Sequence, residues 1–236
     1  MEEHVRIDAR FCGPPGTGHG GYVSGVVAAK IGADSGAGTE ITLRRPVPLD
    51  RNLRVERPEQ GHVTVHDDAT LIAEATTAEL DLDIPEAPSL AQSEDAARRY
   101  FGLGRHPYPQ CFACGDGRAA GSGLAILSGP VDGSDLVAAP WRPHQSLAGS
   151  DGTVGPEYLW AALDCPSAWA MLRGGDLSVL LGRITARVKE GLDVGTPCIV
   201  YAWPIATDGR KLHAGSAIVS EAGELWGASR ATWITI

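Results

Sequence analysis

The feature that most constrains this chain is a loop of glycine and proline that runs directly into an apolar segment. The loop is residues 13–21, GPPGTGHGG, and the segment after it, YVSGVVAAKI, ends at Ile31. Glycine and proline end one element and permit tight turns, and the apolar run is long enough for about three helical turns. Because the first amides of a helix have no internal acceptor, we predict a helix start beside His19 that can bind an oxyanion or carbonyl oxygen. The alternative is a histidine that only caps the helix.

Length and charge limit the class of protein. The 236 residues suffice for one large domain or two small ones. The net charge of -9 argues against a nucleic-acid partner, and no apolar run approaches the about 18 residues of a membrane helix. The acidic start of the chain lacks the apolar region of a signal peptide, and an odd number of cysteines suits a reducing compartment. We expect a cytoplasmic protein without a membrane or nucleic-acid partner.

One order of elements occurs twice along the chain. In the first part, apolar alternation and turn residues predict a helix after the loop and strands at residues 5–11, 39–49, 52–57, 62–66 and 70–80. In the second part they predict a helix at 157–165 and strands at 124–127, 136–139, 179–188, 197–206, 211–221 and 224–235. Between the two parts, a connector holds one short helix at 94–101. This internal duplication predicts an N-terminal unit (1–84), a connector (85–120) and a C-terminal unit (121–236).

A helix followed by an antiparallel run of strands, repeated once, resembles the hotdog fold in its tandem form. The segment Pro15-Gly16-Thr17-Gly18-His19-Gly20-Gly21 also looks like the Gly-x-x-His-Gly-Gly signature of phenylacetyl-CoA-type hotdog thioesterases. The resemblance implies an α+β fold, a double hotdog with two antiparallel sheets each wrapped around a central helix. It also implies an acyl thioester as substrate, with coenzyme A only as part of that substrate and no other cofactor.

The thioesterases with this signature place an Asp or Glu nine residues after the histidine, in the middle of the helix. Here that position is Ala28, which cannot act as an acid or base. When the two helices are aligned so that Tyr22 matches Tyr158, Asp164 takes the equivalent position in the second repeat, where Gly155 replaces the histidine. The second repeat therefore has the carboxylate that the first repeat lacks.

In single-hotdog dimers of this family, the carboxylate is supplied across the interface to the partner's His-Gly-Gly loop. The resemblance implies that a tandem chain makes the same exchange internally, with one working site and one degenerate site. The expected catalytic residues of the working site are His19, Gly20, Gly21 and Asp164.

The residues allow a chemical role for each of these groups. The amide of Gly20 or Gly21 at a helix start would hold a developing oxyanion, and His19 would position the carbonyl or the leaving thiol. Asp164 lies among apolar neighbours, where an unpaired carboxylate is costly and its pKa should rise. It is a candidate base or nucleophile; the alternative is that it only orients a neighbouring loop.

Three aromatic residues on the two helices are candidates for the acyl pocket, with plain core packing as the alternative. They are Tyr22, Tyr158 and Trp160.

A CxxC segment in the connector is a second candidate site. Cys111 and Cys114 have His106 five residues before them. Structural zinc normally takes four ligands, often as two such pairs, and the other three cysteines are isolated in the sequence. We therefore expect no metal and interpret the segment as a buried turn that docks the connector onto the C-terminal unit; zinc held by Cys111, Cys114 and His106 is the alternative.

The leading hypothesis is an acyl-CoA or acyl-carrier-protein thioesterase that uses a site shared between the two units. A non-catalytic acyl-thioester binding protein is favoured instead if Asp164 faces away from the His19 loop. A hotdog hydratase or dehydratase usually pairs Asp and His about five residues apart, and neither half shows this pairing. The partners expected are the acyl thioester or its carrier protein, and a homodimer through sheet edges or helix faces is compatible with the fold.

Overall fold

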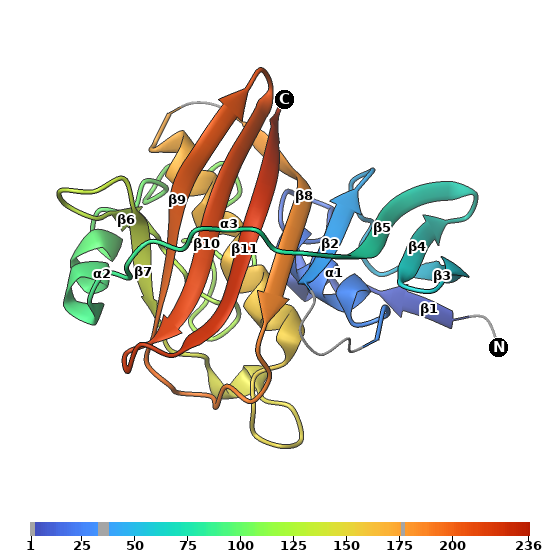
Figure 1. The fold of residues 1–236 in the computed structure, drawn as a ribbon, viewed down its shortest axis with the longest axis horizontal. Helices are drawn as coiled ribbons and strands as arrows, with labels where there is room; N and C mark the ends of the chain where they lie inside the picture. Colours follow the sequence, from blue (N-terminus) through green and yellow to red (C-terminus); the bar gives the residue numbers. More distant parts are fainter. Residues whose placement is uncertain (1–2, 33–37, 176–177) are drawn as a thin grey trace.

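The computed structural model describes residues 3–32, 38–175 and 178–236, and these form one antiparallel sheet of eleven strands with helices packed against it (Figure 1). The strands are β1 (Glu3–Arg6), β2 (Gly38–Leu43), β3 (Asn52–Glu59), β4 (His62–Asp67), β5 (Thr70–Ala78), β6 (Gly129–Pro130), β7 (Val137–Trp141), β8 (Val179–Val188), β9 (Cys198–Asp208), β10 (Lys211–Ser220) and β11 (Leu225–Thr235). The helices are α1 (Gly20–Ala28), α2 (Leu90–Ala97) and α3 (Pro156–Leu172), with short 3-10 turns η1 (Ala9–Phe11) and η2 (Gln145–Leu147).

The two sheets expected from the sequence are joined edge to edge into one sheet. The strand order is β1-β3-β4-β5-β2-β8-β11-β10-β9-β7-β6. The junction is the antiparallel pair β2 and β8, in which Ile41 lies opposite Ile184 and both side chains are fully buried. Pairing these two strands removes two exposed edges, so the expectation of two separate sheets was wrong.

Both halves of the sheet place their strands in the same order. The first half reads β1-β3-β4-β5-β2, and the second reads β7-β9-β10-β11-β8 with β6 beyond it. In each half the long helix follows the first of these strands along the chain, α1 after β1 and α3 after β7. The N-caps of the two helices are His19 and Gly155, the pair of positions that the sequence alignment matched.

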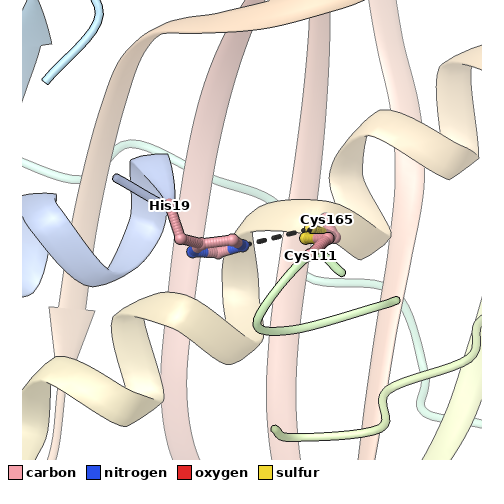
Figure 2. A group of neighbouring side chains, drawn as sticks. All are labelled: His19, Cys111 and Cys165. Atoms are coloured by element: carbon pink, nitrogen blue, oxygen red, sulfur yellow. Dashed lines mark hydrogen bonds between the residues drawn. The ribbon is translucent and has the colours of Figure 1, made fainter. Parts of the chain in front are cut away.

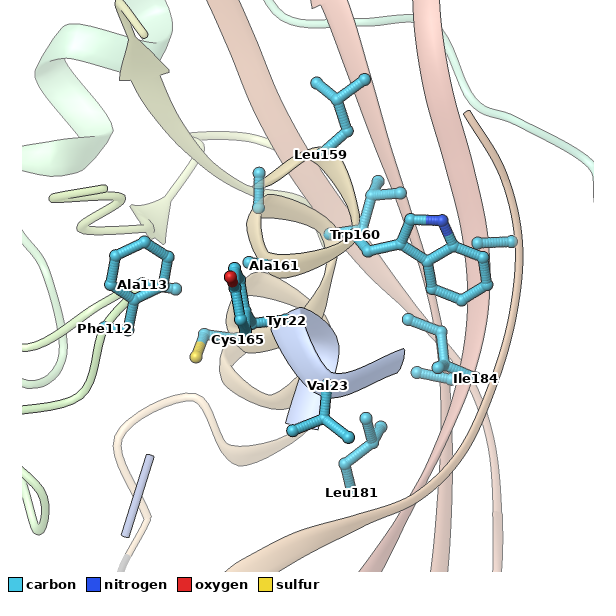
Figure 3. Packing of buried hydrophobic residues seen from close by; sticks show 14 of the residues in the cluster. Tyr22, Val23, Phe112, Ala113, Leu159, Trp160, Ala161, Cys165, Leu181 and Ile184 are labelled. Carbon is cyan, nitrogen blue, oxygen red and sulfur yellow. The ribbon is translucent and has the colours of Figure 1, made fainter. Parts of the chain in front are cut away.

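The two long helices pack directly against each other on one side of the sheet. Figure 3 shows Tyr22 and Val23 of α1 beside Ala161 and Cys165 of α3, with Ile184 of β8 nearby. Two glycines on α1 permit this approach. A Cβ atom at Gly21 would lie 2.5 Å from Cβ of Asp164, and one at Gly25 would lie 2.5 Å from Cα of Glu157.

The second helix is longer than the sequence pattern indicated. It begins with Pro156 in the first turn, as predicted, but continues past Cys165 and through Pro166 to Leu172. Proline inside a helix removes one hydrogen bond and usually ends or kinks it. Here the residues on both sides of Pro166 are buried, and tertiary packing of this kind supplies most helical stability.

The connector crosses the face of the sheet opposite α3. In Figure 1 the segment after β5 passes over β8, β11, β10 and β9 before it reaches α2. Leu80 and Leu82 pack on an outward-facing apolar cluster that includes Ile199 and Trp203. The hydroxyl of Tyr201 donates a hydrogen bond of 3.0 Å to the carbonyl of Pro85. The connector therefore covers apolar surface of the sheet.

Other predicted elements also differ from those observed, and the strand expected at residues 39–49 ends at Leu43. Helix α2 starts at Leu90 instead of residue 94, because Ser89 and Gln92 form a capping box that satisfies its first amides. Residues 124–127 are not a strand, since the amides of Leu124 and Ile126 bond to the carbonyls of Phe112 and Ala113 in the connector. The first strand ends at Arg6 and is followed by the 3-10 turn η1.

None of the helices in the described residues has the length and apolar composition needed to cross a bilayer.

Candidate active site

His19 is held at the N-terminus of α1 by the loop before it. Its amide donates to the carbonyl of Phe11 over 2.8 Å, and its Nδ1 accepts the amide hydrogen of Tyr22 over 3.2 Å. The side chain is only 2% exposed. Because Nδ1 acts as an acceptor, the proton of the neutral ring is assigned to Nε2, which points away from the helix. The histidine thus caps α1 and also presents an N–H donor to the interior.

Asp164 reaches the same place from the middle of α3. Its Oδ2 accepts the amide hydrogen of Gly21 over 2.6 Å and lies 3.4 Å from Nε2 of His19. Its Oδ1 is buried and has no hydrogen-bond partner within the described residues. The structure therefore brings together His19, Gly21 and Asp164 from the two halves of the chain.

The environment of the Asp164 carboxyl raises its pKa. Burial disfavours the charged form more strongly than the charge of His19 and the amide of Gly21 favour it, and the pKa of Asp164 rises to about 6. Burial also acts to lower the pKa of His19, but Cys111 and Asp164 outweigh it, so the pKa of His19 is raised. A doubly protonated ring would lose the Tyr22 bond, since both nitrogens would then carry hydrogen.

Gly20 and Gly21 differ in how their amides are used. The Gly21 amide is already bound to Asp164, whereas no acceptor for the Gly20 amide is found in the described part of the chain. A Cβ atom at Gly20 would lie 2.9 Å from Cδ2 of Leu181, so a larger residue here would require the Leu181 side chain to shift. Of the two predicted oxyanion donors, the structure leaves Gly20 available.

A cavity of about 290 Å³ opens beside these groups. His19, Gly20 and Asp164 belong to its lining, together with apolar side chains of α3, β8 and the last strand, among them Trp169, Leu172, Val179, Leu181 and Trp233. Arg44 and Arg45, which directly follow β2, also line it and are exposed. The cavity therefore combines an apolar wall, a polar inner end and two cations that face solvent.

The three aromatic residues proposed for the acyl pocket lie elsewhere. Tyr22, Tyr158 and Trp160 are not part of the cavity lining described above. The ring of Phe11 stacks on that of Tyr22, with centroids 3.9 Å apart, and lies 6.2 Å from that of Tyr158. Trp160 is buried at the contact between α3 and α1. Their contact with an acyl chain stays a prediction, and the geometry favours core packing.

Two cysteines that the sequence analysis did not assign to the site contact His19. Figure 2 shows Nε2 of His19 pointing toward the sulfurs of Cys111 and Cys165. The distance from Nε2 to Sγ of Cys165 is 3.2 Å, and the two sulfurs are 3.6 Å apart. Cys165 directly follows Asp164 in the sequence. In the sequence, this cluster is indicated only by the position of Cys165 next to Asp164 and by the CxxC segment.

The CxxC segment docks against both halves of the chain. Phe112 donates its amide to the carbonyl of Cys12 over 2.8 Å, and Tyr100 donates its hydroxyl to the carbonyl of Cys114 over 2.8 Å. Cys111 and Cys114 are buried, with sulfurs 3.6 Å apart. Hydrogen bonds from Cys114 and Cys165 hold the pKa of the Cys111 thiol below its ordinary value. Because the sulfur of Cys111 also lies 3.6 Å from that of Cys165 on α3, the predicted turn contacts the N-terminal loop as well as the C-terminal unit.

His106 contacts this segment as a hydrogen-bond donor. Its Nδ1 accepts the amide hydrogen of Tyr108 over 2.8 Å, so its Nε2 carries the proton in the neutral ring. That atom lies 3.1 Å from Sγ of Cys114. The arrangement is an N–H donor to sulfur, in contrast to the metal ligand considered in the sequence analysis.

No protein-family model matches the sequence, and the comparison with curated proteins gave no match either. Solved structures are similar over nearly the whole chain. The tesB protein of Mycobacterium avium subspecies paratuberculosis is 15% identical with a TM-score of 0.61, over 99% of this chain and 96% of that one. The acyl-CoA thioesterase II TesB2 of Mycobacterium marinum is 14% identical with a TM-score of 0.62, over 100% and 96%. A conserved protein with a hot dog fold from Alicyclobacillus acidocaldarius is 10% identical with a TM-score of 0.64, over 100% and 93%.

These likenesses confirm the hotdog fold that the sequence predicted. At such low identity they speak for the fold alone, because one fold supports many functions.

Proposed function

We propose that this protein hydrolyses an acyl thioester, with His19, Gly20 and Asp164 as the reacting site. The observation that carries the proposal is the position of the Asp164 carboxylate. It is buried at the inner end of an apolar cavity and is held by the first turn of α1 with one oxygen unpaired. A buried carboxylate with a raised pKa in a cavity is a typical general base.

The thioester carbonyl would bind at the start of α1. The amide of Gly20 and the positive end of the helix dipole would stabilise the developing oxyanion, and the Nε2–H of His19 would donate to the thioester. Loss of one such donor typically raises a barrier by about 2.7–4 kcal/mol. The acyl chain would lie along the apolar wall of the cavity.

Asp164 would act through Oδ1, the carboxylate oxygen that has no partner in the described structure. In this reaction Oδ1 takes a proton from water while the water oxygen adds to the carbonyl carbon. The carbon–sulfur bond then breaks, and the same proton passes from Asp164 to the leaving sulfur. The products are a carboxylic acid and a free thiol, and the enzyme returns to its starting state.

Two positive charges at the rim favour a substrate with phosphate groups. Arg44 and Arg45 line the cavity and face solvent; Arg44 is ion-paired with Glu74, so a phosphate would bind mainly at Arg45. Arginine binds phosphate well because its planar guanidinium offers several donors. Coenzyme A and the phosphopantetheine arm of an acyl carrier protein both carry phosphate next to the thiol-bearing arm. The substrate would therefore be an acyl-CoA or an acyl carrier protein.

The tandem arrangement is part of this proposal. The equal strand order of the two halves and the matching helix N-caps support a double hotdog in which the halves exchange a carboxylate. With five free thiols, a reducing cytoplasmic setting suits the chain. A non-catalytic binding protein is the second candidate, but it required Asp164 to face away from the His19 loop, and the 3.4 Å contact favours catalysis.

The test is thiol release from a panel of short, medium, long and aromatic acyl-CoAs. Asp164→Asn keeps an acceptor for the Gly21 amide but removes the base, so kcat should fall by about 10²–10⁴-fold. Asp135→Asn, an exposed change away from the cavity, is the matched control and should keep full activity. Undiminished hydrolysis by Asp164→Asn would remove this residue from the mechanism. Acyl-CoA binding without hydrolysis in every variant would favour the binding protein.

A further inference from the structure

Three cysteine sulfurs and one histidine nitrogen converge from three separate segments beside the cavity. Nε2 of His19 and the sulfurs of Cys111 and Cys165 lie within 4.8 Å of one another, and the sulfur of Cys114 is 3.6 Å from that of Cys111. The residues come from the start of α1, the connector and α3 (Figure 2). The proposed hydrolysis uses only the histidine, so it gives the three thiols no role.

We propose that Cys111, Cys114, Cys165 and His19 bind one thiophilic divalent metal ion, for which Zn²⁺ is the best match. Three cysteines and one histidine are an established tetrahedral zinc set, and the CxxC spacing is typical of such sites. Zinc–sulfur bonds of about 2.3 Å place two sulfurs of a tetrahedron about 3.8 Å apart. The two sulfur–sulfur distances of 3.6 Å are already close to that value. Cys114 lies outside the group of ligand atoms within 4.8 Å of one another, so its sulfur must move toward the other ligands when the ion binds.

Burial alone does not explain this cluster. Free cysteine often serves as a small apolar residue, and Cys198 on β9 is an example, since it is buried among apolar side chains. The three cysteines of the cluster are also buried, but their sulfurs face one another and a histidine nitrogen. Sulfurs that face one another and an imidazole nitrogen are arranged as metal ligands are, in contrast to the isolated Cys198.

The neighbouring histidine suits a metal-bound thiolate. His106 directs its Nε2–H at the sulfur of Cys114 over 3.1 Å, and its tautomer is fixed by the Tyr108 amide. Hydrogen bonds of this kind orient and stabilise metal ligands. The ligand set therefore differs from the one considered from the sequence: His106 donates to a ligand, and Cys165 and His19 complete the site.

Metal binding changes the protonation of the site. Ligand thiols must lose their protons, so three thiol protons are released. The three thiolates bring three negative charges, and the metal ion brings two positive charges. The proton on Nε2 of His19 must also leave that atom and move to Nδ1. Nδ1 then no longer accepts the Tyr22 amide, and the bond of 3.2 Å is lost. The metal-bound state is thus distinct from the described one at the start of α1.

The direct test is metal binding by the full chain purified under reducing conditions. Metal analysis of zinc-loaded, desalted protein should find one zinc ion per chain. Titration with Co²⁺ should give the sulfur-to-cobalt charge-transfer absorption and the strong visible bands of a tetrahedral cobalt thiolate. Zn²⁺ should displace the cobalt and abolish both.

Matched serine variants assign the ligands. Cys111→Ser and Cys165→Ser should each lower the affinity for Co²⁺ by at least about 100-fold and reduce the charge-transfer absorption. Cys198→Ser removes an equally buried cysteine outside the cluster and should bind metal like the wild type. His106→Gln should keep one ion per chain with an affinity about 10-fold weaker.

A measurement on the wild type covers the case in which a serine variant fails to fold. Zinc should slow alkylation of Cys111, Cys114 and Cys165, as measured by mass spectrometry, and leave the rate at Cys198 unchanged. The proposal would be overturned if the folded, reduced wild-type protein retained no zinc and gave no thiolate spectrum with cobalt. Unchanged metal affinity in Cys111→Ser and Cys165→Ser would also overturn it. A third contrary result is a Cys111–Cys114 disulfide in the purified protein, together with no metal binding after that disulfide is reduced.

Discussion

Gly21 donates its amide hydrogen to Oδ2 of Asp164 over 2.6 Å, so the first turn of α1 is bound by a carboxylate from α3. The same oxygen lies 3.4 Å from Nε2 of His19, while Oδ1 is buried without a partner in the described residues. The carboxylate is therefore held in place by one oxygen and remains basic at the other. Both hydrolysis and stability should respond to the loss of its charge.

Hydrolysis should have an acid limb near pH 6. Burial raises the pKa of Asp164 to about 6, and only the ionised carboxylate accepts a proton from water. In chelator-treated protein, kcat/KM for an acyl-CoA should fall about tenfold per pH unit below that value. Steady-state rates between about pH 5 and pH 8, with folding monitored by circular dichroism, would check this. A rate that stays constant down to pH 5, as an ordinary carboxyl with a pKa of 3.8 would give, would contradict a buried base.

Asp164→Asn should change how stability depends on pH. A carboxyl whose pKa is raised by folding favours the folded state below its unfolded pKa, and this contribution is lost as pH rises through the folded pKa. A rise from 3.8 to about 6 corresponds to about 3 kcal/mol. Because the variant lacks this titration, its free energy of unfolding relative to the wild type should increase by most of that amount between about pH 4 and pH 8.

Urea unfolding of metal-free protein at the two pH values measures this difference. Asp135→Asn changes an exposed carboxyl and should shift much less. An equal difference between Asp164→Asn and the wild type at both pH values would mean that Asp164 titrates normally in the folded protein.

Gly21→Ala should destabilise the protein although alanine is the better helix former. The new methyl group would lie 2.5 Å from Cβ of Asp164 and 2.6 Å from the carbonyl oxygen of Trp160. Overpacking of this kind typically costs about 1–3 kcal/mol, against about 1 kcal/mol gained from helix propensity. Thermal melts should show a lower Tm than for Val26→Ala, a half-buried position on the same helix. An unchanged Tm would show that α1 and α3 can move apart freely.

The resemblance to hotdog thioesterases implied the pairing of His19 with Asp164, and the alignment of the two helices supplied the position of the carboxylate. His19 and Gly155 do occupy equivalent N-caps, so the alignment placed the carboxylate correctly along α3. The fusion of the two sheets was not predictable, because β2 and β8 show the same alternation as other strands. The choice of strand edges that pair depends on how the two halves of the chain pack against each other.

The sulfur cluster escaped prediction for a different reason. Cys111 belongs to a segment without periodic pattern, and its path between the N-terminal loop and α3 is fixed by tertiary contacts such as the bond of Phe112 to Cys12. Cys165 looked isolated because its partners are distant in sequence. Tyr22, Tyr158 and Trp160 were assigned to the acyl pocket although they do not line the cavity. The sequence does not separate these two roles, because an aromatic residue on a central helix packs equally well in a core.

Chain-length preference should depend on the cavity wall rather than on the tyrosines of the helices. Leu172 lines the cavity, so Leu172→Ala should favour longer acyl chains, by about fourfold in kcat/KM per added methylene. Tyr158→Phe should keep the order of preference, because the Tyr158 ring packs near Phe11 and Tyr22. Rates across a homologous acyl-CoA series would decide. A shift in Tyr158→Phe without one in Leu172→Ala would place the acyl chain along the aromatic group instead.

Zinc should inhibit hydrolysis if both proposals hold, because metal and substrate require the same nitrogen. Nε2 of His19 lies 3.4 Å from Asp164 and 3.2 Å from the sulfur of Cys165, and a metal ligand at that atom has no hydrogen to donate. One equivalent of zinc should lower kcat at least about tenfold, by analogy with the loss of one donor, and a chelator should restore it. Cys198→Ser should respond like the wild type. If zinc binds without inhibiting hydrolysis, the metal site stands but His19 is not both a metal ligand and part of the mechanism. If zinc still inhibits Cys111→Ser and Cys165→Ser, the inhibitory zinc binds at another site.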